Sequence, residues 1–311
     1  MVMFLSDWGA NILKSHGTWL FYGTFQICPK PFSQLYVCMA APETGGNGIP
    51  VGWFLLPNKE AKTYELMFHT LLNKLGGQPN SLKNIMSDFE QAVFKSVRKV
   101  FTRVEHKGCR FHLNQAIWRN LGEHGLQSLF HQSPSFQEII NKLYALSYVK
   151  VNDVVAVYRE HVLPNIQQGL DENVDWQDYL EELHEFGEYY ESTWIERRNH
   201  RSPKYPPVLW NHHDSIMQDG IQTNNYLESY NRTLNSLAGK NANVWIMQDL
   251  FVKQDADSRR TFLSNSAGQD RSNDTGKKHK SLDKRARIQF ILNGYDAMPK
   301  NDLITMLAHS I

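Results

Sequence analysis

The sequence is poor in cysteine and lacks a long hydrophobic run, and each absence excludes a class of protein. Its 311 residues include only three cysteines, Cys28, Cys38 and Cys109, an odd number without close pairing. A disulfide framework is therefore excluded, and we expect a reducing compartment, the cytosol or the nucleus. No stretch reaches the roughly 18 consecutive apolar residues that a membrane-spanning helix needs. Met1–Leu20 does not combine a basic start with an apolar run, so no signal peptide is indicated.

The chain also lacks a marked net charge, because acidic and basic residues nearly balance at +1. The charges are nevertheless segregated. Asp171–Glu196 holds ten carboxylates and neither Lys nor Arg, whereas Lys277–Arg287 holds six basic residues and one acid. The acidic run is typical of the solvated face of a helix, and a role in repelling or positioning DNA is the alternative. The basic block could bind nucleic acid, act as a nuclear import signal or be a solvated linker.

Aromatic and β-branched residues are plentiful near the start of the chain, where they predict three strands. The segments are Trp19–Cys28, Phe32–Ala41 and Val51–Leu56, and Pro29 and Pro31 mark the first turn. Connections this short favour antiparallel neighbours.

Helices and strands alternate in the next part of the chain. Apolar residues at three-and-four spacing predict an amphipathic helix over Lys59–Leu75. A strand that ends at Asp88, a helix over about Glu90–Phe101, a strand over about Arg103–Gly108 and a helix entered through Cys109 follow. This order predicts an α/β fold with a mixed five-stranded sheet.

From His124 to about His213 the pattern indicates helices only, which predicts an all-helical insertion. Helical spacing covers Phe136–Leu146, Asp153–Leu163 and Trp176–Trp194. We expect Pro164 to end the second of these helices, because proline cannot continue a helix interior.

Two further helices are predicted beyond the insertion. Thr223–Asn225 opens a helix that carries Glu228, and Asn241–Lys253 predicts another. Asp255–Lys284 is polar and typical of a mobile segment. Ile288–Leu307 regains apolar character and predicts a short terminal helix or two.

Two acidic residues are candidates for chemistry, and each also has a structural explanation. Asp88 follows a predicted strand, and in α/β sheets the carboxyl ends of strands border the crevice that binds ligands. Because Asp88 also precedes a helix, it could instead be an N-cap. Glu228 could be the partner of Asn225 in an arrangement like a capping box, and it could pair with Arg232 on the helix surface.

Three sequence blocks carry a family resemblance. They are GTFQICPKPFSQLY at Gly23–Tyr36, SDFE with the downstream GCRFH at Ser87–His112, and TNNYLESYNRTLN at Thr223–Asn235. In this order they resemble the motifs of Mutator-like element (MULE) transposases, a family of DDE transposases on a ribonuclease-H-like fold. The resemblance covers roughly Trp19–Leu250. It implies a ribonuclease-H-like core at residues 1–122 and 214–252, a helical insertion at 123–213, and a polar basic linker and C-terminal tail at 253–311.

The resemblance implies DNA cleavage and strand transfer at transposon ends, with Mg²⁺ or Mn²⁺ as cofactor. Asp88 would be the second catalytic acid and Glu228 the third, both as metal ligands. The first acid is missing, because Tyr22 stands directly before Gly-Thr-Phe. A phenol is neutral at physiological pH and cannot bridge two magnesium ions as a carboxylate does. We therefore expect catalysis to be impaired.

Cys109 and His112 form the family's Cys-x-x-His signature. They could be half of a zinc site, but no matching pair follows at finger-like spacing. A small buried thiol and a hydrogen-bonded imidazole near the catalytic crevice are the preferred interpretation. The neighbouring basic residues Lys107, Arg110 and Arg119, interleaved with aromatic residues, predict contacts with DNA phosphates.

The expected partner is the DNA of transposon ends, the expected compartment is the nucleus, and a homo-oligomer is expected because transposition brings two ends together. The first alternative is a transposase-derived protein that binds DNA or protein without catalysis. The second, a cellular nuclease of the same fold, is disfavoured because the predicted helical insertion and the third block resemble the transposases specifically.

Overall fold

The chain folds into a mixed α/β structure, seen in a computed structural model that describes residues 1–24, 27–41, 48–218, 220, 222, 225–239, 243–266 and 275–311. The structure divides into two compact units. The sheet unit comprises Met1–Cys109 and Thr223–Ser272, and the helical unit comprises Arg110–Gln222 and Asn273–Ile311. The predicted α/β class is confirmed.

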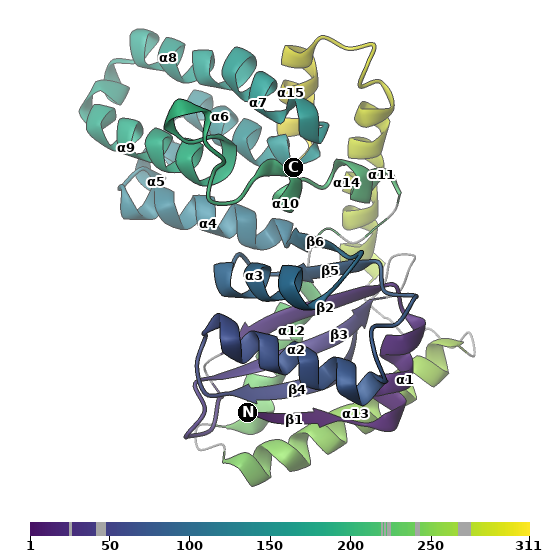
Figure 1. The fold of residues 1–311 in the computed structure, drawn as a ribbon. Helices are drawn as coiled ribbons and strands as arrows, with labels where there is room; N and C mark the ends of the chain where they lie inside the picture. Colours follow the sequence, from purple (N-terminus) through teal and green to yellow (C-terminus); the bar gives the residue numbers. More distant parts are fainter. Residues whose placement is uncertain are drawn as a thin grey trace. The chain divides into compact units, whose positions relative to one another are not determined.

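The sheet has six strands in the order β1-β4-β3-β2-β5-β6 (Figure 1). They are β1 (Val2–Leu5), β2 (Thr18–Thr24), β3 (Gln34–Ala41), β4 (Ile49–Leu56), β5 (Asn84–Ser87) and β6 (Glu105–Gly108). Strands β2, β3 and β4 are antiparallel neighbours, as predicted, and β1 pairs antiparallel with β4. Strand β5 is parallel to both β2 and β6.

The predicted strand number of five is one too low, because β1 has no clear sequence pattern. It is an edge strand of four half-buried residues that pairs only with β4, from Val2 opposite Leu55 to Leu5 opposite Gly52. Helix α1 (Asp7–Ser15) follows directly, and Ser6 caps it by accepting a 2.9 Å hydrogen bond from the Gly9 N–H.

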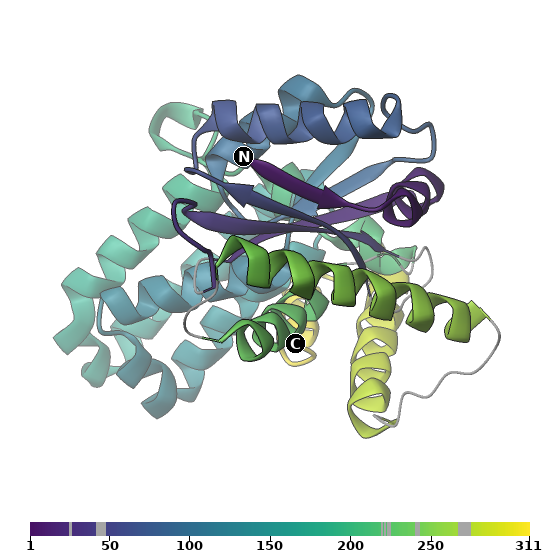
Figure 2. The ribbon, with the colours of Figure 1, turned by 90° about the horizontal axis from the view of Figure 1, so that it is seen from below.

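Helices cover both faces of the sheet. Helices α2 (Ala61–Leu75) and α3 (Gln91–Val100) bury their apolar residues against one face, as the spacing of Tyr64, Met67 and Phe68 predicts. Helices α12 (Asn225–Ala238) and α13 (Val244–Ser266) cover the other face. Figure 2 shows the sheet between α2 and α13. Burial of aromatic side chains on both sides is the main source of stability for such a layered unit.

Helix α13 extends well beyond its predicted end at Lys253, into the segment expected to be mobile. The reason is a set of contacts with the start of the chain. Asp255 Oδ1 accepts a 2.8 Å hydrogen bond from Ser6 Oγ, and the Phe262 ring lies 6.2 Å from that of Trp8. Such contacts between distant residues leave no local pattern in a polar sequence.

The helical unit is built from helices, apart from an isolated bridge between Arg197 and Arg201 among its described residues. Its α-helices are α4 (Arg110–Glu123), α5 (Gln127–Gln132), α6 (Pro134–Ala145), α7 (Val154–Val157), α8 (Leu163–Glu172), α9 (Leu180–Tyr190), α10 (Pro207–Trp210), α11 (His213–Met217), α14 (Thr275–Asn293) and α15 (Lys300–Ala308). Short 3₁₀ segments are η1 (Leu146–Tyr148), η2 (Val151–Asp153), η4 (Val174–Tyr179) and η6 (Arg198–His200), and π-helical turns are η3 (Tyr158–Val162) and η5 (Glu191–Ile195).

Two expectations within this unit have different outcomes. Pro164 does not end a helix but lies in the first turn of α8, where a missing N–H is tolerated, directly after the π turn η3.

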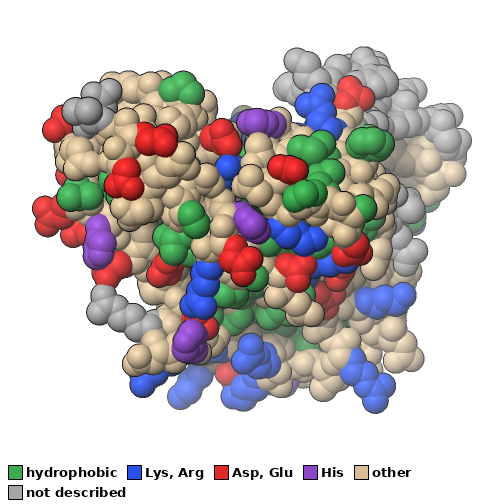
Figure 3. Space-filling model, turned by 90° about the horizontal axis from the view of Figure 1, so that it is seen from above, with side chains coloured by type: hydrophobic (Ala, Val, Ile, Leu, Met, Phe, Trp, Pro, Cys, Tyr) green, Lys and Arg blue, Asp and Glu red, His purple; other side chains and the backbone are tan. Residues whose placement is uncertain are grey.

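The acidic run forms a solvated face, as predicted: Leu183, Phe186 and Tyr190 are buried. Of its carboxylates, Asp171, Glu172, Asp178, Glu181, Glu185 and Glu188 are exposed. Figure 3 shows one face of the molecule, on which both acidic and basic side chains are exposed.

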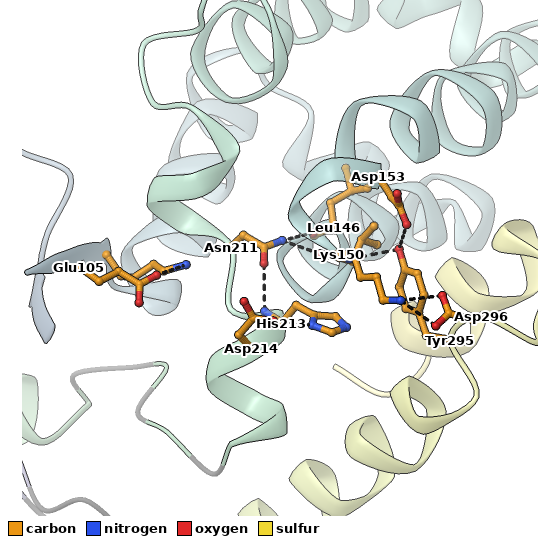
Figure 4. Close-up of polar contacts among 11 residues, drawn as sticks. Glu105, Leu146, Lys150, Asp153, Asn211, His213, Asp214, Tyr295 and Asp296 are labelled. Carbon is orange, nitrogen blue, oxygen red and sulfur yellow. Dashed lines mark hydrogen bonds and ion pairs between the residues drawn. The ribbon is translucent and has the colours of Figure 1, made fainter. Parts of the chain in front are cut away.

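The C-terminal helices are tied to the rest of the helical unit by a polar cluster (Figure 4). Tyr295 Oη donates a 2.7 Å hydrogen bond to Asp153 Oδ2 and accepts one from the Lys150 N–H, while Lys150 Nζ lies 2.6 Å from Asp296 Oδ1. Nearby, Asn211 is buried and donates a 2.6 Å hydrogen bond to the Val149 carbonyl. Residues assigned to a tail by the sequence analysis thus belong to this unit.

Of the described helices, none combines the length and the hydropathy that a bilayer span requires.

Candidate functional site

Position 22 lies in a row of residues that crosses four strands. Tyr22 is opposite Val37, Val37 is opposite Trp53, and Trp53 is opposite Phe4. Trp53 Nε1 donates a 2.9 Å hydrogen bond to Tyr230 Oη of α12, and its ring stacks at 5.3 Å on Phe251 of α13. Because residues opposite each other in a sheet point to the same side, Tyr22 lies on the face that α12 and α13 cover.

Asp88 follows the strand next to Tyr22. Strands β2 and β5 are parallel, with Leu20 opposite Met86, and Asp88 comes directly after β5. The pairing ends at Leu20 and Met86, so Tyr22 and Asp88 each lie two residues beyond the last paired position. The two sequence-predicted positions therefore lie near the same end of two neighbouring parallel strands, which are roughly 4.8 Å apart where they pair.

Glu228 belongs to the helix that covers the same face. Helix α12 begins at Asn225, so Glu228 lies in its first turn. Two residues later, Tyr230 makes the hydrogen bond to Trp53. The Glu228 side chain, and Thr223 and Asn224 of the same motif, lie outside the described residues, so a contact with Asp88 or Asn225 remains a prediction.

Asp88 is not a helix cap. The N-cap of α3 is Glu90, and no side chain makes the capping hydrogen bond there. Asp88 keeps part of its surface accessible, but its Oδ1 atom is buried, and no hydrogen-bond partner for this atom exists among the described residues. Burial and then the charge of Glu90 raise the pKa of Asp88 to about 7, against an opposite effect of Lys59. An environment of this kind is typical of a functional carboxylate.

The SDFE motif and the first two residues of GCRFH lie side by side in the sheet unit. Ser87 is opposite Gly108, and the Cys109 N–H donates a 2.8 Å hydrogen bond to the Ser87 carbonyl. The Phe89 ring lies over Gly108 so closely that a Cβ at that position would be 2.3 Å from two ring carbons. Only glycine therefore fits beside this ring. The contact lets the two motifs pack closely although they are far apart in the sequence.

Cys109 and His112 do not form a recognisable zinc site. Cys109 is a buried free thiol, and none of the three cysteines is in a disulfide. His112 lies in α4, where burial and then Arg119 lower its pKa to about 4, so its imidazole is neutral at pH 7. In the described part of the chain, no group of three or more His, Cys, Asp or Glu side chains could hold a metal ion.

The predicted basic residues have different surroundings. Lys107 Nζ lies 3.0 Å from Glu105 Oε1, and Arg119 is exposed. Arg110 is buried, its guanidinium lies 4.7 Å from the centre of the Tyr148 ring, and its Nε has no hydrogen-bond partner among the described residues.

Two residues near Arg110 were not singled out individually by the sequence analysis. Burial and the charge of Arg110 lower the pKa of Lys284, and Arg285 donates a 2.9 Å hydrogen bond to the Gly220 carbonyl. Both belong to the basic block Lys277–Arg287, which was the available sequence signal. Arg110, Lys284 and Arg285 together are the basic cluster of the helical unit.

The comparisons with known proteins agree with the motifs. A search of curated proteins found no match. A family model described as MULE transposase domain matches residues 18–116, from the start of β2 into α4. This stretch includes Tyr22, Asp88 and the Cys109–His112 signature but not Glu228. The resemblance expected from the sequence is therefore confirmed: residues 18–116 of this chain are similar to the MULE transposase domain.

Proposed function

We propose that the chain is a MULE-type transposase core with a ribonuclease-H-like sheet, whose DNA cleavage and strand transfer are impaired by Tyr22. The observation that supports the proposal is the parallel pairing of β2 with β5, because Tyr22 and Asp88 follow the last paired residues of these neighbouring strands, Leu20 and Met86, by two positions each. From β2 to α4, the elements follow the order of three strands, helix, strand, helix, strand and helix that the resemblance implies. The sixth strand, β1, is an addition at the edge.

The residues present fit a two-metal site only in part. Two ions that share a phosphate need carboxylates on both sides, and magnesium prefers hard, charged oxygen ligands. Asp88 and Glu228 are carboxylates of the required kind, and Glu228 belongs to α12, but Tyr22 supplies a phenol. Bound Mg²⁺ or Mn²⁺ would neutralise charge on a phosphodiester and polarise it. With a neutral ring in the first position, we expect efficient two-metal catalysis to be lost.

Phosphate binding can survive this loss, and the basic cluster supports it. Arg110, Lys284 and Arg285 gather positive charge in the helical unit, where burial and then the charge of Arg110 lower the pKa of Lys284. A DNA phosphate would supply the missing charge and a partner for Arg110 Nε. The second candidate function, a non-catalytic protein that binds DNA, rests on this cluster. Binding of transposon ends, a homo-oligomer and a nuclear location are parts of the same proposal.

The test restores the missing acid. Purified chain and its Tyr22→Asp variant are incubated with supercoiled plasmid DNA and with Mg²⁺ or Mn²⁺, and nicking is measured on gels. We expect nicking by the variant at least about tenfold faster than by the unaltered chain, which corresponds to about 1.4 kcal/mol of barrier. Adding Asp88→Ala to the variant should abolish the gain.

Two outcomes separate the candidates. If the unaltered chain nicks DNA and Asp88→Ala abolishes this, the proposed impairment is wrong. If Tyr22→Asp gains nothing while both proteins bind DNA, the non-catalytic function is favoured. For that case, Arg110→Gln should weaken DNA binding and reduce its salt dependence, with Lys204→Gln as a matched change of charge elsewhere in the helical unit.

A further inference from the structure

Helix α13 carries a stripe of exposed apolar side chains along its length. Trp245, Val252 and Leu263 are exposed to 74%, 63% and 56%, although all three lie within the helix. The residues that α13 buries against the sheet unit lie on its other side, and they are Met247, Leu250, Phe251 and Ser258. A single exposed apolar residue is ordinary, but a stripe that follows one side of a long helix indicates an interaction surface.

The stripe has the spacing of a coiled-coil seam. Six exposed positions follow one another along α13 in alternating steps of four and three residues, the spacing that keeps every a and d residue of a heptad on one side of a helix. They are Trp245, Asp249, Val252, Ala256, Arg259 and Leu263, with Asp249, Ala256 and Leu263 at the a positions. These six residues are called the α13 seam below.

Contacts on the opposite side of α13 hold the seam outward. The Phe251 ring stacks on that of Trp53 at 5.3 Å, and Asp255 Oδ1 accepts the hydrogen bond from Ser6 Oγ. Turning the helix to bury the seam would break both contacts. A second helix that pairs with the seam would meet a helix that is already folded and fixed, which lowers the entropic cost of association.

The charges of the seam fit a second copy of α13 in the antiparallel orientation. In such a pair each a residue faces a d residue of the other helix, and a two-fold axis passes close to Gln254. The facing pairs are Trp245 with Leu263, Asp249 with Arg259, and Val252 with Ala256, each occurring twice by symmetry. A parallel pair in register would instead set Asp249 against Asp249 and Arg259 against Arg259, and like charges repel.

The two charged residues of the seam are available for this pairing. Neither Asp249 nor Arg259 takes part in an ion pair within the described part of the chain, whereas the neighbouring Arg260 Nη2 lies 2.9 Å from Asp257 Oδ1. In the antiparallel pair each would meet an opposite charge between two apolar layers. Polar residues inside a seam are a known means of fixing the register and orientation of a coiled coil.

We infer that the chain forms a symmetric dimer in which the α13 seam pairs antiparallel with the same seam of a second copy. The proposed function includes a homo-oligomer but assigns no surface to it. The inference adds the surface, the orientation and the register, and it rests on α13 rather than on Tyr22 or Asp88. Lys253 lies at the flank of the seam beside its own copy, and this repulsion keeps the expected dissociation constant in the range of roughly 1–100 µM.

The first test measures the self-association of the full chain by sedimentation velocity from about 1 to 100 µM, without DNA or added metal. We expect the unaltered chain to pass from monomer to dimer over this range. Val252→Glu would set a carboxylate in an apolar layer and should weaken the dimer by more than about tenfold. Leu66→Glu is the matched control, because Leu66 of α2 is also an apolar residue of the sheet unit that is 55% exposed, and this variant should dimerise normally.

Reversal of the charges tests the register. Asp249→Arg and Arg259→Asp should each weaken the dimer by more than about tenfold, because each sets like charges against each other in the seam. The double variant pairs opposite charges again and should return the dissociation constant to within about threefold of the original value. Both positions are exposed, so the changes leave the core intact, and circular dichroism checks the fold of every variant.

Three results would overturn the inference. A chain that remains monomeric at about 100 µM would leave the seam to a helix of another protein. A dimer that Val252→Glu leaves intact would use another surface, and a dimer that the double reversal does not restore would have another register. None of these measurements involves position 22, so the proposed function is decided separately by the nicking assay.

Discussion

At the scale of single residues, close packing explains why the GTF and GCRFH motifs each contain a glycine. Gly23 leaves room for Gln34 and Tyr36, and Gly108 leaves room for Phe89. The family resemblance identified both motifs from the sequence, but it could not show which side chains pack against the two glycines. That information depends on the pairing of strands that are far apart in the chain.

Gly108→Ala should destabilise the sheet unit by about 1–3 kcal/mol, because the new methyl group would overlap the Phe89 ring. Urea unfolding at pH 7 measures the effect. The matched control is Gly187→Ala in α9, where no atom lies within 4 Å of the added Cβ and alanine favours the helix. Equal stability of the two variants would show that Phe89 does not occupy the space above Gly108.

His106 should make stability depend on pH. Burial and then Arg98 lower its pKa to about 3, and Nε2 lies 2.8 Å from Ser87 Oγ. Between about pH 6.5 and 3 the unfolded chain binds a proton that the folded chain does not, so acid favours unfolding by roughly 1.4 kcal/mol per pH unit. This contribution is complete above pH 6.5 and falls as the pH is lowered.

The measurement compares the unaltered chain with His106→Gln, which keeps a polar group near Ser87. From pH 7 to pH 5 the unaltered chain should lose about 1–2 kcal/mol more of its unfolding free energy than the variant does. Other titrating groups contribute equally to both proteins and cancel in the difference. Identical pH dependence would mean that His106 is accessible to protons in the folded state.

At the scale of elements, the sequence predicted what local periodicity encodes. The apolar spacing of Tyr64, Met67 and Phe68 predicted α2 and its buried face correctly. It failed for β1, for the length of α13 and for Pro164. Strand β1 is held by its pairing with β4, and the end of α13 by contacts such as that of Asp255 with Ser6. Pro164 is accommodated directly after a π turn.

Ser6 connects helix α1 with the unpredicted end of α13 and offers a test. Its hydroxyl accepts from the Gly9 N–H at the start of α1 and donates to Asp255 of α13. Ser6→Ala should therefore cost about 1–2 kcal/mol of unfolding free energy, the usual effect of losing an N-cap together with a second hydrogen bond. Ser6→Thr retains the hydroxyl and serves as the control. Unchanged stability of Ser6→Ala would contradict this role in holding α1 and the end of α13.

At the scale of the whole molecule, the chain forms two units, and each unit combines two stretches that are separated in the sequence. The helical unit takes in Asn273–Ile311, through contacts such as Tyr295 with Asp153. The resemblance gave the candidate positions by motif, yet it gave no sign of the hydrogen bonds that link Gln34, Tyr64 and Glu90. Burial and hydrogen-bond partners appear only once the sheet is assembled.

The central claim is that position 22 is the missing acid beside Asp88. Its most direct test is anomalous scattering from Mn²⁺ in crystals of the unaltered chain and of Tyr22→Asp. We expect a peak between position 22 and Asp88 in the variant that the unaltered chain lacks. A variant map without a peak between these two positions, with Asp88 turned away from β2, would contradict the account.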